Sequence, residues 1–302
     1  MGNHHDHHHH THEISAKNIG IAIFLNIIIS VSQIIGGIIS GSMALLTDAL
    51  HNFSDVISLS ISWFTNRMAK RKSTIKQTFG YKRAEILSAF INSATLIAIA
   101  FYLIIEAVDR FSNPQPVLSD LVIYFAIGSI IINTISVLLL HKDAKESMNM
   151  RSSYLHLLSD VMTSIGVMIG GFIMKYYGIF WIDSLLSVLI AFYLIFSTYK
   201  LLIDSLKILM QFSPKNIDIM DIGEKINHLA EVKNIHHVHL WQLNDKDLFF
   251  EAHIDLENDI SITDFQLVLK DIESILATQN IFHFNIQPEY SVDDGKDFIV
   301  QH

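Results

Sequence analysis

The sequence contains no cysteine and little charge, and both shortages narrow its class. Of 302 residues, 0 are Cys and only 17% are Asp, Glu, Lys or Arg. Without thiols the chain forms no disulfide, and a metal site must use His, Asp, Glu or backbone oxygen, which disfavours thiol-preferring Cu(I). Half of the residues are hydrophobic and fall in long runs. This is the composition of a membrane protein.

Two further absences concern partners and targeting. The formal net charge is −9, and no basic stripe on a soluble fold indicates nucleic-acid binding. The N-terminus opens with histidines rather than the basic region of a signal peptide, and the first apolar run is long enough to span a bilayer. We therefore expect no nucleic-acid partner and an uncleaved first span.

Six apolar runs fill the first two-thirds of the chain. A helix needs about 20 mostly apolar residues to cross the hydrocarbon. Small residues or proline separate the runs, as at Ser40-Gly41-Ser42 and Asn113-Pro114-Gln115-Pro116. The runs cover 17–39, 43–66, 84–107, 119–141, 151–175 and 178–203. The pattern predicts an α-helical membrane protein with six transmembrane helices.

Basic residues are unevenly distributed between these spans. The loops on one side hold only Arg110 and Lys175. The loops on the other side are basic, with Arg67, Lys70, Arg71, Lys72, Lys76, Lys82, Arg83, Lys142, Lys145 and Arg151. The positive-inside rule places the basic loops in the cytoplasm, and with them both termini.

The segments outside the spans have other compositions. Residues 1–13 form a leader with seven histidines, which reads either as a purification tag or as a native metal-collecting segment. Its interruption by Asp6 and Thr11 favours the native segment, and we expect it to be disordered because it has few apolar residues. Residues 14–210 are the predicted six-helix domain, and 211–302 a separate domain.

The separate domain alternates between helical and strand patterns. Helices are predicted at Asp218–Ala230 and 263–277, and strands at His237–Leu243, Leu248–Leu256 and Phe282–Ile286. The order helix, strand, strand, helix, strand predicts a small two-layer α+β domain.

Two predicted spans carry the same polar motif, H-x-x-x-D. His51 and Asp55 form it in the second span, and His156 and Asp160 in the fifth. Residues four apart share a helix face, and ionisable groups at membrane depth are functional sites by default. Together the motifs offer two nitrogens and two oxygens, a tetrahedral set suited to Zn²⁺. Each pair could instead bond its helix to a neighbour, but the repetition favours a metal site.

The charges of these residues suggest an exchange mechanism. Two carboxylates neutralise a divalent cation while neutral imidazoles complete its shell. When the metal leaves, protonation of His51 and His156 restores neutrality, and free histidine titrates near pH 6.5. Asp48, three residues before His51, is a supporting candidate that lines the route or stabilises a ligand. We therefore expect exchange of metal for protons.

Three stretches resemble the cation diffusion facilitators, dimeric metal–proton antiporters. They are GSMALLTDALH at 41–51, FGYKRAE at 79–85 and NMRSSYLH at 149–156. The resemblance implies that His51, Asp55, His156 and Asp160 are the transport ligands. The histidine in both motifs is similar to the zinc-preferring branch, whereas manganese and iron branches usually carry Asp or Asn there. A homodimer in the bacterial inner or plasma membrane, lowering cytoplasmic zinc, is implied.

The C-terminal third is similar to the family's cytoplasmic ferredoxin-like domain, which helps hold the dimer. His236, His239 and Trp241 match its H-x-x-H-x-W pattern, and Gln287 lies in its closing strand. The resemblance implies a regulatory zinc site, with exposed polar residues on a sheet as the alternative. Its candidate ligands are His236, His253, His283 and Glu289. Residues 263–277 lack the further histidine that some members of the family use in a two-metal cluster. Residues 67–82 contain neither His nor Asp, so we expect no metal site between the second and third spans.

The leading hypothesis is a homodimeric exporter of Zn²⁺ in exchange for protons, not an enzyme. Cd²⁺, Co²⁺ and Mn²⁺ remain open as substrates, since ligand type separates Zn²⁺ poorly from Cd²⁺ and Co²⁺. A membrane metalloenzyme lacks an H-E-x-x-H helix or an evident general base here. A membrane-anchored metal sensor is supported only by the histidines, and six spans are excessive for an anchor.

Overall fold

A computed structural model describes residues 10–69, 73–141, 148–293 and 295–300. The described residues form two compact units. The helical unit comprises the described parts of Met1–Trp63 and Ile91–Lys200, and the mixed unit those of Phe64–Phe90 and Leu201–His302. The mixed unit therefore holds more than the domain predicted from residue 211, because it includes the segment between the second and third predicted spans.

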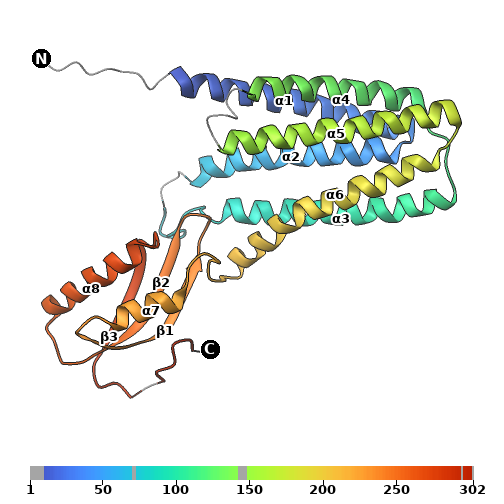
Figure 1. Ribbon diagram of the computed structural model, residues 1–302. Coiled ribbons are helices and arrows are strands. Elements are labelled where there is room, and N and C mark those ends of the chain that lie inside the picture. Colours follow the sequence, from blue (N-terminus) through green and yellow to red (C-terminus); the bar gives the residue numbers. More distant parts are fainter. Residues whose placement is uncertain (1–9, 70–72, 142–147, 294, 301–302) are drawn as a thin grey trace, which may run out of the picture. The chain divides into compact units, whose positions relative to one another are not determined.

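The described part of the chain contains six long helices that coincide with the six predicted spans (Figure 1). Five of them are long and apolar enough to cross a membrane. The remaining one, α2, has 27 residues and carries Asp48, His51, Asn52 and Asp55 along its length. The helices are α1 (His10–Ser40), α2 (Met43–Ala69), α3 (Ala84–Ser112), α4 (Ser119–Leu140), α5 (Met148–Tyr177) and α6 (Trp181–Leu209).

The start of α1 corrects the predicted extent of the leader. Helix α1 begins at His10, so residues 10–13 of the leader are helical, while residues 1–9 lie outside the described part of the chain. Extending a helix that already exists adds one hydrogen bond per residue, and only nucleation is unfavourable. A long apolar helix can therefore carry a few polar residues at its end.

The helical unit places apolar side chains outside and polar ones inside. Ile38, Ile105 and Phe196 are more than two-thirds exposed. Soluble monomers rarely expose large contiguous apolar surfaces, whereas lipid tails solvate them as well as a protein core does. Gln33 and Asn133 are fully buried between the helices. This distribution is the one a bilayer requires.

Tertiary contacts hold the start of α2 in place. Gly41, with φ of 73°, turns the chain between α1 and α2. The buried carboxylate of Asp183, on α6, accepts hydrogen bonds from the Ser42 hydroxyl at 2.5 Å and from the Met43 amide at 2.6 Å. First-turn amides of a helix lack partners within it, and a carboxylate there also suits the helix dipole. The distant Asp183 therefore caps α2 and fixes the helix that carries the first H-x-x-x-D motif.

The mixed unit contains one three-stranded sheet and two short helices, in the predicted order. Strands β1 and β2 are antiparallel, and β2 and β3 are parallel. The prediction of an α+β domain is confirmed, although β1 begins five residues earlier than expected. The elements are α7 (Ile219–Asn227), β1 (Val232–Gln242), β2 (Leu248–Leu256), α8 (Ile262–Ala277) and β3 (His283–Glu289).

Both short helices pack on one face of the sheet. Ile222 of α7 and Ile272 of α8 join Ile235, Phe250 and other alternate strand residues in the core. Because successive strand residues point to opposite faces, the polar residues between them lie on the other face. The sequence thus divides the sheet into an apolar face and a face that carries histidines and carboxylates.

The segment before α3 packs against the strands of the mixed unit. The Phe79 ring meets the Phe249 ring at 5.2 Å between centroids, and the Lys82 ammonium lies 2.7 Å from an Asp247 carboxylate oxygen. The hydrogen bond from Lys82 holds the pKa of Asp247 below its usual 3.8. The FGYKRAE stretch thus contacts the β1–β2 hairpin of the same unit.

Candidate metal sites

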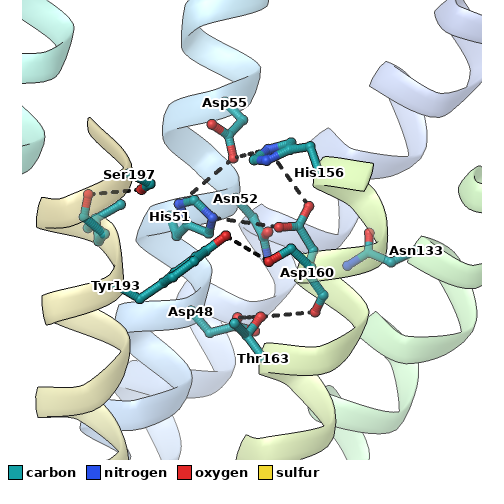
Figure 2. Close-up of polar contacts among 12 residues, drawn as sticks. Asp48, His51, Asn52, Asp55, Asn133, His156, Asp160, Thr163, Tyr193 and Ser197 are labelled. Carbon is teal, nitrogen blue, oxygen red and sulfur yellow. Dashed lines mark hydrogen bonds and ion pairs between the residues drawn. The ribbon is translucent and has the colours of Figure 1, made fainter. Parts of the chain in front are cut away.

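The two H-x-x-x-D motifs meet inside the helical unit. We call His51, Asp55, His156 and Asp160 the helix cluster (Figure 2). His156 Nε2 lies 2.9 Å from Asp55 Oδ2, and His51 Nε2 lies 3.6 Å from Asp160 Oδ1. One ligand atom from each of His51, His156 and Asp160 lies within 4.8 Å of the others. Helices α2 and α5 thus each direct the histidine and the aspartate of their motif toward the other helix.

Burial within the helix cluster is uneven. The side chains of His51 and Asp160 are 5% and 1% exposed, whereas those of Asp55 and His156 are 26% and 39% exposed. In the described part of the chain, both ring nitrogens of His51 and both carboxylate oxygens of Asp160 are buried without a hydrogen bond. Buried polar atoms normally have partners. These four atoms therefore point to a ligand that supplies the missing interaction, and their chemistry fits a divalent cation.

Asp48 lies behind the cluster and holds three helices together. Its carboxylate accepts hydrogen bonds from Gln33 of α1 at 2.8 Å, and from Thr163 and Ser164 of α5 at 2.8 and 3.1 Å. The Thr163 hydroxyl also lies 3.0 Å from the backbone oxygen of Asp160. Asp48 is thus connected to the backbone of a cluster residue through a single side chain. This geometry fits the supporting role predicted for it.

Several polar side chains around the cluster were not predicted from the sequence. Tyr193 of α6 lies against His51 with ring centroids 5.8 Å apart (Figure 2). Its hydroxyl is 2.7 Å from that of Ser159. Buried Asn52 donates to Gln33 at 3.1 Å. Asn52 lies one residue after His51, inside the first H-x-x-x-D motif, so the motif could have drawn attention to it. Nothing in the sequence connects Tyr193 to α2.

The polar face of the sheet carries a second cluster. We call His236, His253, Asp255 and Glu289 the sheet cluster. His236 pairs with His253 across β1 and β2, and Asp255 pairs with Glu289 across β2 and β3. Glu289 Oε2 lies 3.2 Å from His236 Nε2, and its Oε1 lies 2.8 Å from His253 Nδ1. Ligand atoms of His236, His253 and Glu289 lie within 4.8 Å of one another.

His283 lies apart from this cluster, which corrects the predicted set of four. It pairs with Phe249 on β2, and the two rings are 4.2 Å apart between centroids. Six residues of strand separate it from Glu289, or about 20 Å at roughly 3.3 Å per residue. Asp255 joins the cluster instead, because it lies two residues after His253 on the same face of β2. That two-residue spacing was readable from the sequence.

A lysine occupies the space that a metal would need in the sheet cluster. The Lys296 ammonium lies 2.9 Å from Asp255 Oδ1, 3.0 Å from Glu289 Oε2 and 3.5 Å from His236 Nε2. Two imidazoles and a carboxylate fit zinc by type and spacing, but an ammonium at these distances excludes a cation bound to the same atoms. The cluster as folded therefore does not fit a metal.

Comparison with known proteins covers both units. The family model of the cation efflux transmembrane domain matches residues 19–210. The family model of the cation efflux protein cytoplasmic domain matches residues 214–291. The first match ends at residue 210 and the second begins at residue 214.

Curated relatives match over most of their length. The chain is 36% identical to the cadmium, cobalt and zinc/H(+)-K(+) antiporter of Bacillus subtilis, over 85% of this chain and 83% of the relative. It is 33% identical to the metal cation efflux system protein CzcD of Cupriavidus metallidurans, over 96% and 90%. It is 32% identical to the zinc transporter ZitB of Escherichia coli, over 88% and 84%. The chain belongs to the cation efflux family, the cation diffusion facilitators.

Proposed function

We propose that this chain exports a divalent metal cation, zinc foremost, in exchange for protons. The helix cluster carries the proposal, because it combines two imidazoles, two carboxylates and buried atoms that lack hydrogen bonds. His51, Asp55, His156 and Asp160 are the proposed ligands of the transported ion. Zinc prefers such a four-coordinate set of nitrogen and oxygen.

Charge balance supports proton exchange. Asp55 and Asp160 contribute two negative charges, which one divalent cation or two protonated imidazoles neutralise equally. Their charged partners in the described part of the chain are His51 and His156. Leaving two partly desolvated carboxylates uncompensated is unfavourable, so loss of the metal favours uptake of protons. The Bacillus subtilis relative is named as an antiporter of H(+).

The ligand set leaves the choice among similar metals open. His and Asp side chains bind Zn²⁺, Cd²⁺ and Co²⁺, while Mn²⁺ prefers a set richer in oxygen. Relatives are named both as zinc transporters and as cadmium, cobalt and zinc antiporters. We propose zinc as the main substrate, with cadmium and cobalt as further substrates.

The remaining parts of the proposal concern orientation and assembly. The basic loops place both termini in the cytoplasm, so transport lowers cytoplasmic zinc across a bacterial inner or plasma membrane. The protein works as a homodimer, and the domain that matches the family's cytoplasmic domain contributes to the dimer. The histidine-rich leader collects metal and is accessory to transport.

Flux through vesicles containing the purified full chain tests the proposal. Zinc, cadmium, cobalt and manganese are offered against a proton gradient, to the native chain and to Asp160→Ala. We expect zinc flux that depends on the pH gradient and is lost in Asp160→Ala. Asp109→Ala, which removes an exposed carboxylate of α3, is the matched control and should transport normally. Zinc flux retained by Asp160→Ala would contradict the proposal.

A further inference from the structure

The C-terminal segment after β3 returns to the sheet and is anchored at three places. Lys296 reaches the sheet cluster. The backbone oxygens of Asp297 and Phe298 accept hydrogen bonds from the amides of His237 and Val238 on β1, at 3.1 and 2.9 Å. These contacts continue the sheet along an edge strand whose amides would otherwise face solvent.

The receiving edge of β1 has a local shape that suits this segment. The register with β2 shifts between His236 and His239, and His237 has a φ of 52°. A β-bulge leaves its extra residue outside the ladder, and positive φ is uncommon for a residue other than glycine. Both amides donated to the C-terminal segment come from this bulge. The bulge thus binds the segment beside the cluster.

The third anchor is an aromatic side chain in the core. Phe298 packs against the core of the mixed unit, over Gly223 of α7. A Cβ atom at Gly223 would lie 2.5 Å from the Phe298 ring, which is too close for the ring to stay. The absence of a side chain at Gly223 therefore makes room for the Phe298 ring in its docked position.

The charges at the sheet cluster explain why a cation is held there. Asp255 and Glu289 are buried, with side chains 12% and 5% exposed. Buried carboxylates require compensation, and the Lys296 ammonium supplies one positive charge to both. A divalent cation in its place would bring one more positive charge to the same two carboxylates.

We propose that Lys296 is a built-in cation that occupies the sheet cluster and that a divalent metal binds there only by displacing the C-terminal segment. The cluster is thereby satisfied at low metal. Binding of metal releases residues 296–298 from the sheet cluster and the edge of β1. Because the segment is tethered, it competes with metal at high effective concentration. The apparent affinity for metal is therefore the intrinsic affinity multiplied by the fraction of molecules in which the segment is undocked.

The inference is independent of transport and is tested on the full chain in detergent. Zinc affinity at the cluster is taken from the part of a calorimetric titration that His253→Ala removes. Hydrogen exchange of residues 290–300 and of the His237 and Val238 amides reports docking. We expect zinc to increase exchange in the native chain, and Lys296→Met to bind zinc at least about tenfold more tightly.

Two further variants distinguish displacement of the C-terminal segment from loss of the Lys296 charge. Gly223→Ala should displace the Phe298 ring, raise exchange of residues 296–298 and tighten zinc binding without altering a cluster residue. Alanine is also the better helix former, so α7 should fold. Lys233→Met removes an exposed lysine of β1 and should bind zinc as the native chain does. If Lys296→Met does not fold, the native chain and Gly223→Ala decide the question.

Three results would overturn the inference. One is equal zinc affinity in the native chain, Lys296→Met and Gly223→Ala. Another is continued protection of residues 296–298 when the cluster is loaded with zinc. The third is no zinc binding at the cluster in any variant. Each is distinguishable from a failure of transport, because none of these measurements involves flux.

Discussion

The helix cluster and the sheet cluster each combine two imidazoles with two carboxylates, but they differ in what offsets the negative charge. Lys296 lies within 3.0 Å of an oxygen of each sheet-cluster carboxylate. In the helix cluster, the described partners of Asp55 and Asp160 are His51 and His156, which carry a charge only when protonated. A cluster with an internal cation is stable alone, whereas one without it needs a mobile cation or protons. The same ligand types are therefore compensated by the chain itself in the sheet cluster, whereas in the helix cluster they are left to a mobile cation or to protons.

Replacement of one histidine in each cluster should reveal the largest difference between the two clusters. His51→Ala removes a proposed ligand of the transported ion and should lower zinc flux in vesicles by about 100-fold or more, since even losing an outer partner of a metal ligand costs about 10–100-fold. His253→Ala should lower flux by no more than about threefold, because the sheet cluster does not carry cargo in this account. Equal loss in the two variants would show that the clusters do not have separate roles.

Addition of zinc or of a chelator should change the stability of the two units differently. Zinc at about 100 times its Kd stabilises a site that binds only the folded state by about 2.7 kcal/mol. We expect a stabilisation of this order for the native chain in thermal unfolding, and its loss in Asp160→Asn. Chelator should leave hydrogen exchange of β1 and β2 unchanged, because Lys296 already compensates the sheet cluster. Loosening of these strands by chelator would argue that the sheet cluster needs metal to fold.

Thr163 tests whether Asp48 positions the helix cluster. Thr163→Val removes the hydroxyl between the Asp48 carboxylate and the Asp160 backbone while keeping the shape of the side chain. We expect zinc affinity in transport to fall about tenfold, as is typical when a partner of a metal ligand is lost. Thr163→Ser keeps the hydroxyl and should retain most of the affinity. If both variants transport as the native chain does, Asp48 has a purely structural role.

The smallest expected effect concerns Lys82 and Asp247 in the mixed unit. The pKa of Asp247 is lowered by its hydrogen bond to Lys82, so the folded state favours the carboxylate. The pair therefore stabilises the unit above the unfolded pKa of 3.8, and this contribution disappears as pH falls below it.

Both side chains of this pair are more than a third exposed, so solvent screens it. Lys82→Met should lower the free energy of unfolding by no more than about 1 kcal/mol at neutral pH. The difference from the native chain should shrink in acid-unfolding curves as pH falls below 3.8, and vanish below the lowered pKa of Asp247 in the folded state. Lys76→Met, at an exposed position of the same segment, is the control. A difference that persists in acid would mean that Lys82 acts through packing.

The spans and the α+β order were predictable because they depend on local periodicity. Apolar runs near 20 residues can satisfy their backbone in a bilayer only as helices, and α1 to α6 follow the predicted runs. The pairing of α2 with α5 followed from a repeated motif rather than from packing. The sheet register was not predictable, because a strand pattern shows which residues share a face but not which residues of another strand they meet. The family resemblance grouped His283 with Glu289, whereas the register places His283 beside Phe249.

The sequence by itself determined the class of the protein, its six spans, and the His and Asp side chains available to a metal, because hydrophobicity and residue chemistry are local properties. Only the tertiary structure decided which of these side chains are neighbours and which already have a partner. Asp183 caps a helix 140 residues earlier in the chain, and Lys296 compensates Asp255 and Glu289. Such contacts join distant segments through packing. For this reason, two clusters that look alike in the sequence differ in charge.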